Sequence, residues 1–232
     1  MLKMDMNGVD LGLPSGLKWA TMNVGATSVT DYGKYYAWGE TKAYGEEDQT
    51  NERNYSFSGT YAKTDYGWST YKWADDDNGE SFSKYTNSTK TTLDKEDDAA
   101  TQNWGGAWRM PTHIELQELL DNCYWVWTSS YNGSGIAGYI VYAVKSPSDK
   151  GVVITSGGIR SSNYSLSDAH IFLPAAGCRI NGISNRVGTN GYYWSSSVCF
   201  NTNAFTQSFY SYKCEKSNFA RFFGYSVRAV CK

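Results

Sequence analysis

Near its C-terminus the chain reads N-G-Y-Y-W-S-S-S over 190–197 and S-V-R-A-V-C-K over 226–232. The 28 residues between them, 198–225, contain six of the nine Phe, three Tyr and a single aliphatic side chain larger than Ala, that of Val198. A buried strand or helix of this length normally carries Leu, Ile and Val. Rigid rings mixed with Asn, Ser, Thr and Cys are instead typical of a surface that contacts a ligand.

Strand periodicity divides the segment 205–210 into two faces. One face carries two rings and an amide: Phe205, Gln207 and Phe209. The other carries small hydroxyls and a ring: Thr206, Ser208 and Tyr210. We expect Phe205 and Phe209 to lie in the core. Four side chains are then expected on the surface: Thr206, Ser208, Tyr210 and Tyr212.

The clearest helix follows Pro111. Thr112 and Glu115 form a T-x-x-E capping box, in which each side chain accepts a hydrogen bond from a backbone N–H at the helix start. An apolar stripe follows at helical spacing, formed by Leu116, Leu119, Leu120 and Cys123. This spacing predicts a helix that ends near Asn122. A second, shorter helix is expected over 95–103, with Asp94 as its cap.

The rest of the chain reads as short strands and long loops. The alternation of Val9, Leu11 and Leu13 predicts a strand within 8–20, and a second strand is expected within 31–39. Residues 40–90 are polar with scattered rings, which indicates a long ordered loop region. Further strands are expected over 123–128, 138–145, 151–155, 170–175, 191–195, 204–212 and 225–231. No repeat or linker is evident, so we expect one α+β domain over 1–232.

Composition excludes several classes of protein. The net charge is −2 without a basic tract, whereas nucleic-acid binding needs clustered Lys and Arg. No apolar run is long enough for a membrane span, and the first residues, M-L-K-M-D-M-N-G, show no signal peptide. The five Cys include no C-x-x-C pair, which favours free thiols with Cys123 in the core. The sequence leaves one alternative open, a single disulfide between C-terminal cysteines.

Catalytic and metal-binding patterns are weak. Neither His113 nor His170 has a recognisable nucleophile or ligand cluster beside it, so structural roles are favoured and no cofactor or metal is expected. The run Asp75 to Glu80 resembles the start of a calcium loop. Thr86 occupies the position where such a loop has a bidentate Glu, so a solvated turn is favoured and calcium binding stays open.

The string W-G-G-A-W-R-M-P-T, 104–112, supports two interpretations. The two Trp rings could stack on sugars, or they could pack beneath the helix while Arg109 binds backbone carbonyls. We favour the structural interpretation, because the Gly pair between the rings permits close backbone packing.

A set of motifs spans nearly the whole chain in order: V-D-L-G-L-P-S-G-L-K-W-A-T-x-N-V-G-A (9–26), Y-A-W-G-E-T (36–41), D-D-A-A (97–100), W-G-G-A-W-R-M-P-T (104–112), I-F-L-P-A-A-G (171–177), G-Y-Y-W-S-S-S (191–197) and S-V-R-A-V (226–230). Together they resemble the Fibrobacter succinogenes major paralogous domain, which is abundant in Bacteroidetes and gut phages. The resemblance implies a C-type lectin-like fold with a small twisted antiparallel sheet, two helices and long irregular loops. The E-P-N, Q-P-D and W-N-D strings of calcium-dependent sugar sites are absent from the sequence.

Some members of that family are variable proteins of diversity-generating retroelements, in which a reverse transcriptase rewrites the C-terminal region at adenines. The resemblance implies a variable, ligand-facing region over 178–225. Its expected ligand-binding residues are Ile180, Asn181, Ile183, Asn185, Cys199, Phe200, Asn201, Asn203, Thr206, Ser208, Tyr210, Tyr212, Cys214, Ser217, Asn218, Phe219, Phe222 and Phe223.

The leading hypothesis is a non-catalytic binding protein of a phage tail tip or bacterial cell surface. Its ligand would be a protein or glycan on a cell surface, with affinity raised by multivalent display or a homo-oligomer. The first alternative is a carbohydrate-binding module that uses Trp and Tyr platforms. The second is an enzyme related to formylglycine-generating enzymes, which share the broad fold and need a reactive Cys pair. The third is a purely structural scaffold.

Overall fold

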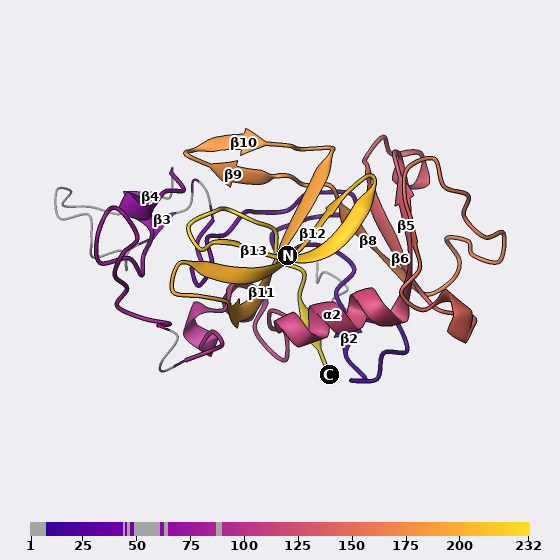
Figure 1. Ribbon diagram of the computed structural model, residues 1–232, viewed down its shortest axis with the longest axis horizontal. Helices are drawn as coiled ribbons and strands as arrows, with labels where there is room; N and C mark the ends of the chain where they lie inside the picture. The colour runs from indigo at the N-terminus through magenta and orange to yellow at the C-terminus, as the bar shows by residue number, and fades with distance from the viewer. Residues whose placement is uncertain (1–7, 44, 46, 49–60, 63–64, 87–89) are drawn as a thin grey trace.

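The computed structural model describes residues 8–43, 45, 47–48, 61–62, 65–86 and 90–232. Over these residues it is an α+β structure in which two α-helices accompany several small twisted sheets (Figure 1). The helices are α1 Ala99–Trp104 and α2 His113–Asn122. The strands are β1 Val9–Asp10, β2 Lys18–Trp19, β3 Glu47–Asp48, β4 Tyr61–Ala62, β5 Cys123–Thr128, β6 Gly138–Ala143, β7 Val153–Ile154, β8 His170–Pro174, β9 Cys178–Ile180, β10 Ile183–Asn185, β11 Asn190–Val198, β12 Asn203–Tyr210, β13 Lys213–Ala220 and β14 Val230–Cys231.

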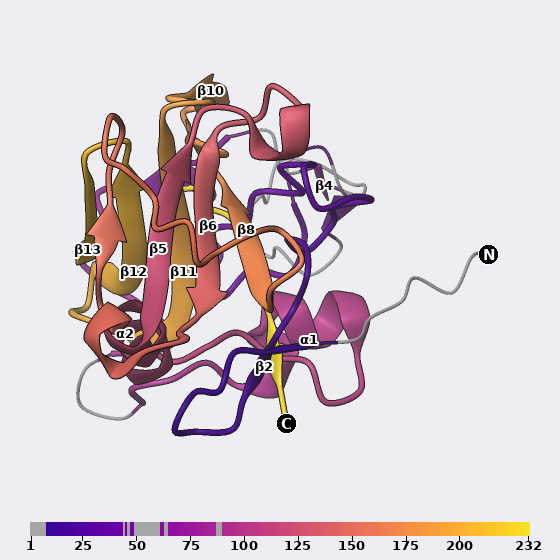
Figure 2. The same ribbon diagram turned by 90° about the vertical axis from the view of Figure 1, so that its right-hand side faces the viewer.

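Two sheets form the centre of the molecule. One has the order β7-β5-β6-β8, and the other, β11-β12-β13, is antiparallel throughout. Helix α2 contacts β5 of the first sheet and all three strands of the second (Figure 2). A smaller sheet, β1-β2-β14, joins the first and last strands of the chain. It lies at the opposite end of the molecule from the β9–β10 hairpin (Figures 1 and 2).

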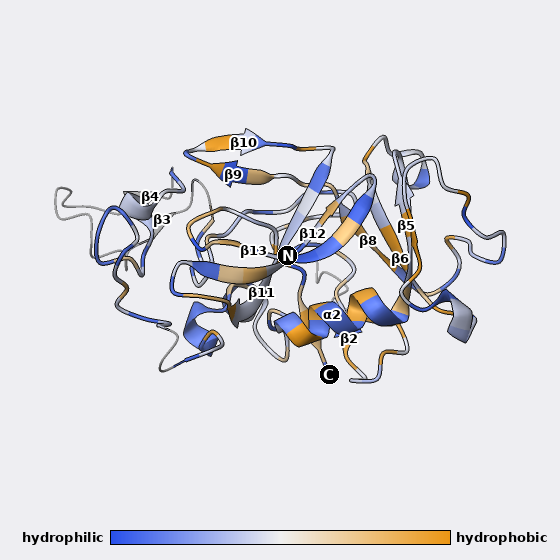
Figure 3. Ribbon diagram, viewed as in Figure 1, coloured by the Kyte–Doolittle hydropathy of each residue, from blue (hydrophilic) through white to orange (hydrophobic). Residues whose placement is uncertain are grey.

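Helix α2 confirms its sequence prediction. Thr112 accepts a hydrogen bond from the Glu115 backbone N–H, and Glu115 accepts one from the Thr112 N–H, so the capping box is complete. The helix alternates hydrophilic and hydrophobic residues along its length (Figure 3), and Leu116 and Leu119 are buried. The apolar stripe therefore packs inward, as its spacing requires. Strand β5 has the predicted bounds, 123–128.

Replacing Glu115 with Gln should remove the ion pair with Arg109, in which Arg109 Nη2 lies 2.6 Å from Glu115 Oε1, while keeping the cap, since Gln also serves in a capping box. We expect the free energy of unfolding at neutral pH to fall by about 1 kcal/mol. Burial raises the pKa of Glu115, but hydrogen bonds from Arg109 and Thr112 outweigh it and the pKa is lowered. A carboxyl with a lowered pKa stabilises the fold above its unfolded value and loses this contribution as the pH falls through its folded value. Urea denaturation of both proteins at neutral pH and below pH 4.5, the ordinary value for Glu, tests this. A difference that does not shrink in acid would contradict it.

The β11-β12-β13 sheet separates two parts of the hydrophobic core. Tyr192 and Trp194 belong to a cluster that includes Trp38 and Tyr225. Phe209 belongs to a second cluster, which includes the buried Leu side chains of α2 and the inward rings of β5 and β6. Strand β12 is therefore covered on both faces.

Two of the sequence motifs meet in a buried hydrogen-bond network. Arg228 of S-V-R-A-V is only 1% exposed, and its Nε and Nη2 donate to Asn23 Oδ1 at 3.0 and 2.7 Å. The guanidinium also donates to the carbonyls of Ala20 and Phe172 at 3.0 and 2.8 Å. Arg228 therefore ties the N-terminal segment, strand β8 and the C-terminal segment together.

The predictions of secondary structure differ from the structure in several places. The helix expected over 95–103 is a 3₁₀ turn, Lys95–Asp97, followed by α1. The break falls at Asp98, whose backbone is extended and whose side chain accepts from Thr101 N; Asp94 makes no such cap. Residues 31–39 form no strand, only a bridge between Tyr36 and Tyr225, because Gly33 and Gly39 have left-handed backbones at φ 72° and 76°.

Strands β3, β4, β9 and β10 were not predicted, and neither was β13. Its sequence, K-C-E-K-S-N-F-A, is polar because it is the edge strand of its sheet and much of it is exposed or half-buried. The P-S-G turn of 14–16 is present, since Gly16 N donates to the Leu13 carbonyl at 2.9 Å. Residues 8–20 contain only the short strands β1 and β2, although Leu11 and Leu13 are buried. Much of the expected loop region 40–90, and the first seven residues, lie outside the described residues.

Candidate binding surface

The β9–β10 hairpin carries the first group of expected ligand-binding residues. Ile183 pairs with Ile180 beside the turn, and Asn185 pairs with Cys178. All of β10 is exposed, with Ile183 69% exposed, and the tip of the hairpin is hydrophobic (Figure 3). Along its other edge, β9 pairs with the segment after β13 through a bridge between Arg179 and Gly224. The hairpin therefore lies beside the second group of expected residues.

That second group contributes to a chain of aromatic rings that we call the aromatic band. Its members are Tyr212, Tyr210, Tyr192, Tyr225, Phe219, Phe223, Phe222 and Trp68. Consecutive ring centroids are 4.4–6.4 Å apart, which is the range of favourable aromatic pairs.

Two buried members of the band form what we call its floor, and the other members are half-buried or exposed. Tyr192 and Tyr225 are stacked at 4.9 Å and are 5% and 2% exposed. Phe219 and Phe223 are half-buried and pack against the same core cluster. Tyr212 is 70% exposed. The band therefore continues the core outward to the surface beside the hairpin.

The expectation that Thr206 and Ser208 are displayed is wrong. Both side chains are fully buried. Ser208 lies opposite Tyr192 on β11, and its hydroxyl is 2.8 Å from the Ser217 hydroxyl on β13. Because β12 is the central strand of a sheet covered on both sides, its alternation separates two buried faces, not an inside from an outside.

The matching expectation for the core face holds for Phe209, which is fully buried. Phe205 is only half-buried, since it stacks on His113 at the start of α2 with ring centroids 4.5 Å apart. Gln207 is 1% exposed and donates to the Glu215 carbonyl at 3.0 Å. The assignment to the core is therefore confirmed for Phe209 and only in part for Phe205, and their face of the strand also carries a buried amide.

Cys214 was expected on the ligand surface and lies elsewhere. It is half-buried and packs against the core cluster that contains Tyr139 and Phe209, because it pairs with Phe209 and shares its face of the sheet. All five cysteines are free thiols, and Cys123 is fully buried, as predicted. Burial raises the pKa of both Cys199 and Cys214, whereas reactive cysteines have a lowered pKa.

The β11–β12 loop carries the third group of expected residues. Phe200 is 58% exposed and Asn201 is exposed, whereas Cys199 and Asn203 are half-buried. Asn203 Nδ2 donates to Asn218 Oδ1 across the sheet at 2.8 Å. The loop borders the end of the aromatic band, since Arg221 N donates to the Thr202 carbonyl at 2.9 Å.

Arg221 fixes the segment that carries Phe222 and Phe223. Its side chain is fully buried, and its guanidinium lies 4.0 Å from the centroid of Phe82. It donates to the Tyr85 carbonyl at 3.2 Å, while Nε and Nη2 have no hydrogen-bond partner. Burial lowers the pKa of Arg221. The position belongs to the core although it lies within 198–225.

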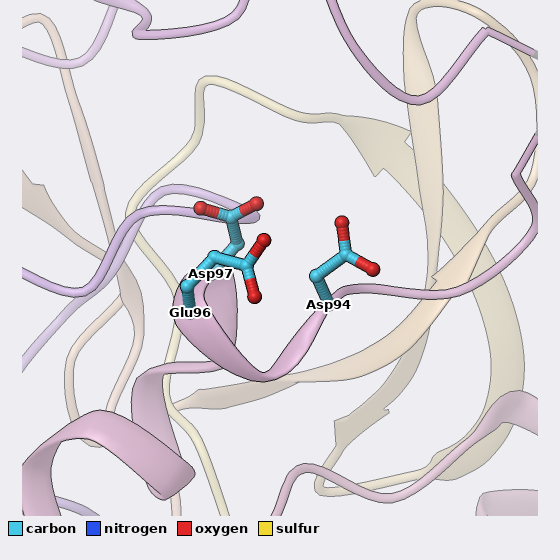
Figure 4. A group of neighbouring side chains, drawn as sticks. All are labelled: Asp94, Glu96 and Asp97. Carbon is cyan, nitrogen blue, oxygen red and sulfur yellow. The ribbon is translucent and has the colours of Figure 1, made fainter.

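An acidic group lies near Arg221, where Asp94, Glu96 and Asp97 bring carboxylate oxygens within 4.8 Å of one another (Figure 4). This spacing could hold a cation. Lys84 Nζ, however, lies 2.5 Å from Asp97 and 2.9 Å from Asp94, and Lys90 Nζ lies 2.5 Å from Asp94. The ammonium groups therefore already neutralise this cluster.

The turn of 75–80 is held by Asp76. Its carboxylate accepts from the backbone N–H of Asn78, Glu80 and Ser81 and from the Ser81 hydroxyl at 2.6–3.2 Å, and these hydrogen bonds lower the pKa of Asp76. The exposed turn favoured from the sequence is confirmed.

The remaining candidates for chemistry have structural partners. Trp108 is 7% exposed and lies edge-on to Trp104 at 5.6 Å, as the structural interpretation predicts. Arg109 donates to the Met110 carbonyl, and it also pairs with Glu115, which the sequence did not suggest. His170 makes contacts of 2.8 and 2.7 Å with the Tyr131 hydroxyl and the Asp168 carbonyl.

Sequence reasoning missed four residues of the surface. Tyr192 lies in the motif G-Y-Y-W-S-S-S and Tyr225 at the end of 198–225; neither was among the expected ligand-binding residues, yet they form the floor of the band. Trp68 comes from the polar loop region, where only its ring signalled a role in packing. Arg186 follows Asn185 immediately and is exposed, but no motif marked it.

No helix in the described part of the chain has the length and apolar character that crossing a bilayer requires. Comparison of the chain with protein-family models, curated proteins and solved structures finds no match.

Proposed function

We propose that this chain is a non-catalytic binding protein with a C-type lectin-like fold that presents the aromatic band and the β9–β10 hairpin to a macromolecule on a cell surface. One observation carries the proposal: the rings form a continuous series from Tyr212 to Trp68 beside the exposed hairpin. Tyr and Phe supply contact area at low entropic cost, and Asn and Ser supply adaptable hydrogen bonds. The proposed mechanism is association alone.

We further propose that the outward positions of 178–225 are variable, as in the family that the motifs resemble, and that the protein works in a phage tail tip or on a bacterial surface. The support is positional. Ile183, Asn185, Phe200 and Tyr212 are exposed, so other side chains at these positions would leave the core intact. Multivalent display would then raise the modest affinity of a single surface.

The DNA beside the gene tests diversification. We expect a near-copy of the codons for 178–225 next to a reverse transcriptase gene, differing mainly at adenines. Independent isolates should vary at Ile183, Asn185 and Tyr212 and keep Ser208 and Arg221. A locus without the copy, or variation spread evenly over the chain, would refute this part of the proposal.

Binding is tested with a defined probe, a yeast-displayed library of a small folded domain with randomised surface positions. We expect binders selected on the wild-type chain to lose at least about 100-fold in affinity for the triple variant Tyr210→Ala, Tyr212→Ala, Phe223→Ala, because aromatic anchors dominate interfaces. Circular dichroism and thermal melting establish that the triple variant is folded. Binders that ignore the triple variant would place recognition elsewhere.

A carbohydrate-binding module is the second candidate, because a cavity of about 340 Å³ lies beside Trp108, Arg109 and Asp98. Trp108 is nearly buried, so it offers a sugar little of its ring face. A glycan array separates the two functions. Binding that is lost in Trp104→Ala and Trp108→Ala, and kept in the triple variant above, would favour the module.

A further inference from the structure

The backbone of Arg186 is held in an unusual conformation beside the aromatic band. Its φ is 58°, in the left-handed region that non-glycine residues seldom adopt. Its carbonyl accepts from Thr189 N, Thr189 Oγ1 and Asn190 N at 3.2, 2.9 and 3.1 Å. Gly177 packs so closely beneath the turn that a Cβ there would lie 2.2 Å from the Asn185 carbonyl oxygen. The position of the Arg186 Cα, from which the side chain extends, is therefore fixed.

The side chain of Arg186 is exposed, and no ion pair with another described residue neutralises it. Lys213, a surface cation at the same end of the molecule, does have a partner, since it lies 2.5 Å from Glu215. Exposed guanidinium groups bind carboxylates through two parallel hydrogen bonds. Arg186 thus offers a cation, on a backbone held in place, to a group from outside the chain.

Arg186 is joined to the floor of the aromatic band through Asn190, whose backbone N–H donates to the Arg186 carbonyl at 3.1 Å and whose Nδ2 donates to the Tyr192 hydroxyl at 2.7 Å. Burial raises the pKa of Tyr192 to about 12, and the Arg186 charge acts in the opposite direction. The same charge opposes the rise in the pKa of Tyr225 and of Cys178 that burial causes. A group bound by Arg186 would therefore also meet the aromatic band, and a partner that covers the band would exclude water and strengthen the charge pairing.

The ring geometry favours a protein partner over a glycan. Some neighbouring rings of the band are nearly perpendicular, with interplanar angles of 87° for Tyr192–Tyr210 and 89° for Tyr192–Phe219, whereas Tyr210–Tyr212 and Tyr192–Tyr225 are stacked face to face at 17° and 16°. Neither arrangement presents ring faces side by side in one plane, on which successive sugars could stack. The uneven relief of these rings suits apolar side chains, which can occupy the spaces between ring edges.

We propose that Arg186 is a specificity-determining residue that binds an Asp or Glu side chain of a protein partner seated on the aromatic band. This inference rests on the proposed binding function. The partner surface would carry one carboxylate next to apolar side chains. The charge of Arg186 would select a partner with a carboxylate, and the shape of the aromatic band would select its apolar side chains.

The library described above provides the test when sorted in parallel on wild type and on Arg186→Gln. We expect wild-type binders to be enriched in Asp and Glu beside apolar residues, and this acidic enrichment to disappear in the Arg186→Gln sort. The best wild-type binders should lose about tenfold in affinity for Arg186→Gln and less than about threefold for Arg186→Lys. Arg160→Gln, which removes another exposed guanidinium, is the matched control and should leave affinity unchanged.

Three outcomes would overturn the inference: equal acidic content in the two sorts, equal affinity of wild-type binders for Arg186→Gln, or failure to select any binder. Arg186-dependent binding to sialylated or uronic-acid glycans, without acidic enrichment in the protein sort, would overturn the assignment to a protein. Binders that need the band and ignore Arg186 would leave the proposed function standing and remove only this inference. Binders that ignore the band would remove both.

Discussion

Replacing Arg228 with Ala is expected to lower the free energy of unfolding by about 4 kcal/mol, or to prevent folding altogether, because each buried acceptor left without a donor costs about 1–3 kcal/mol. The side chain makes four hydrogen bonds to three acceptors: Asn23 Oδ1 and the carbonyls of Ala20 and Phe172. None of these acceptors could be reached by water without opening the core. Urea denaturation followed by Trp fluorescence measures the change.

Two variants make the expectation specific. Arg228→Lys keeps the charge but lacks the planar fork, so it should recover only part of the loss. Arg160→Ala removes an exposed arginine and should change stability by less than about 0.5 kcal/mol. A fully stable Arg228→Ala protein would mean that the network is not the connection between the two ends of the chain that its geometry indicates.

Replacing Ser208 with Tyr is expected to destabilise the protein by about 3 kcal/mol or more, since a large ring must enter a packed interior. Ser208 is fully buried, between Tyr192 on one strand and Glu215 on the next. The reverse exchange at the surface, Tyr212→Ser, should change stability by less than about 0.5 kcal/mol, because Tyr212 is 70% exposed. Thermal melting of the two variants measures the contrast.

The pair of variants also tests the division of 178–225 into core and surface. Diversification that reached Ser208 freely would yield many unfolded proteins, whereas diversification at Tyr212 would not. Similar melting temperatures for Ser208→Tyr and wild type would show that the interior of the sheet adapts, and would return Ser208 to the candidate surface.

Local signals in the sequence were enough for some elements and not for others. The capping box and apolar stripe of α2 are properties of ten neighbouring residues, and they predicted its bounds. The alternation along β12 was also visible in the sequence, but the assignment of Thr206 and Ser208 to the surface was wrong. What lies against each face depends on Tyr192 at one side and Phe209 at the other, through contacts with distant strands, and period-2 alternation carries no information about them.

Prediction of the candidate surface was limited in the same way, because contacts between distant segments are not visible in the local sequence. The rings of 205–223 were visible as a group, yet the buried floor of the band is Tyr192 and Tyr225, and one end is Trp68. These residues come together only through long-range pairing such as Arg179 with Gly224. Arg186 gave no signal in the sequence, because the close approach of Gly177 to its turn comes from a distant part of the chain.

The pairing of β1 and β14 with the two edges of β2 has a practical consequence. Trp19 is paired with Val9 on one side and with Val230 on the other, so the points where the chain enters and leaves this sheet are neighbours. A segment whose two ends are neighbours can be inserted into a loop of a carrier protein without separating the two ends of that loop. Because the β9–β10 hairpin lies at the far end of the molecule (Figures 1 and 2), such a graft would hold it outward, away from the carrier.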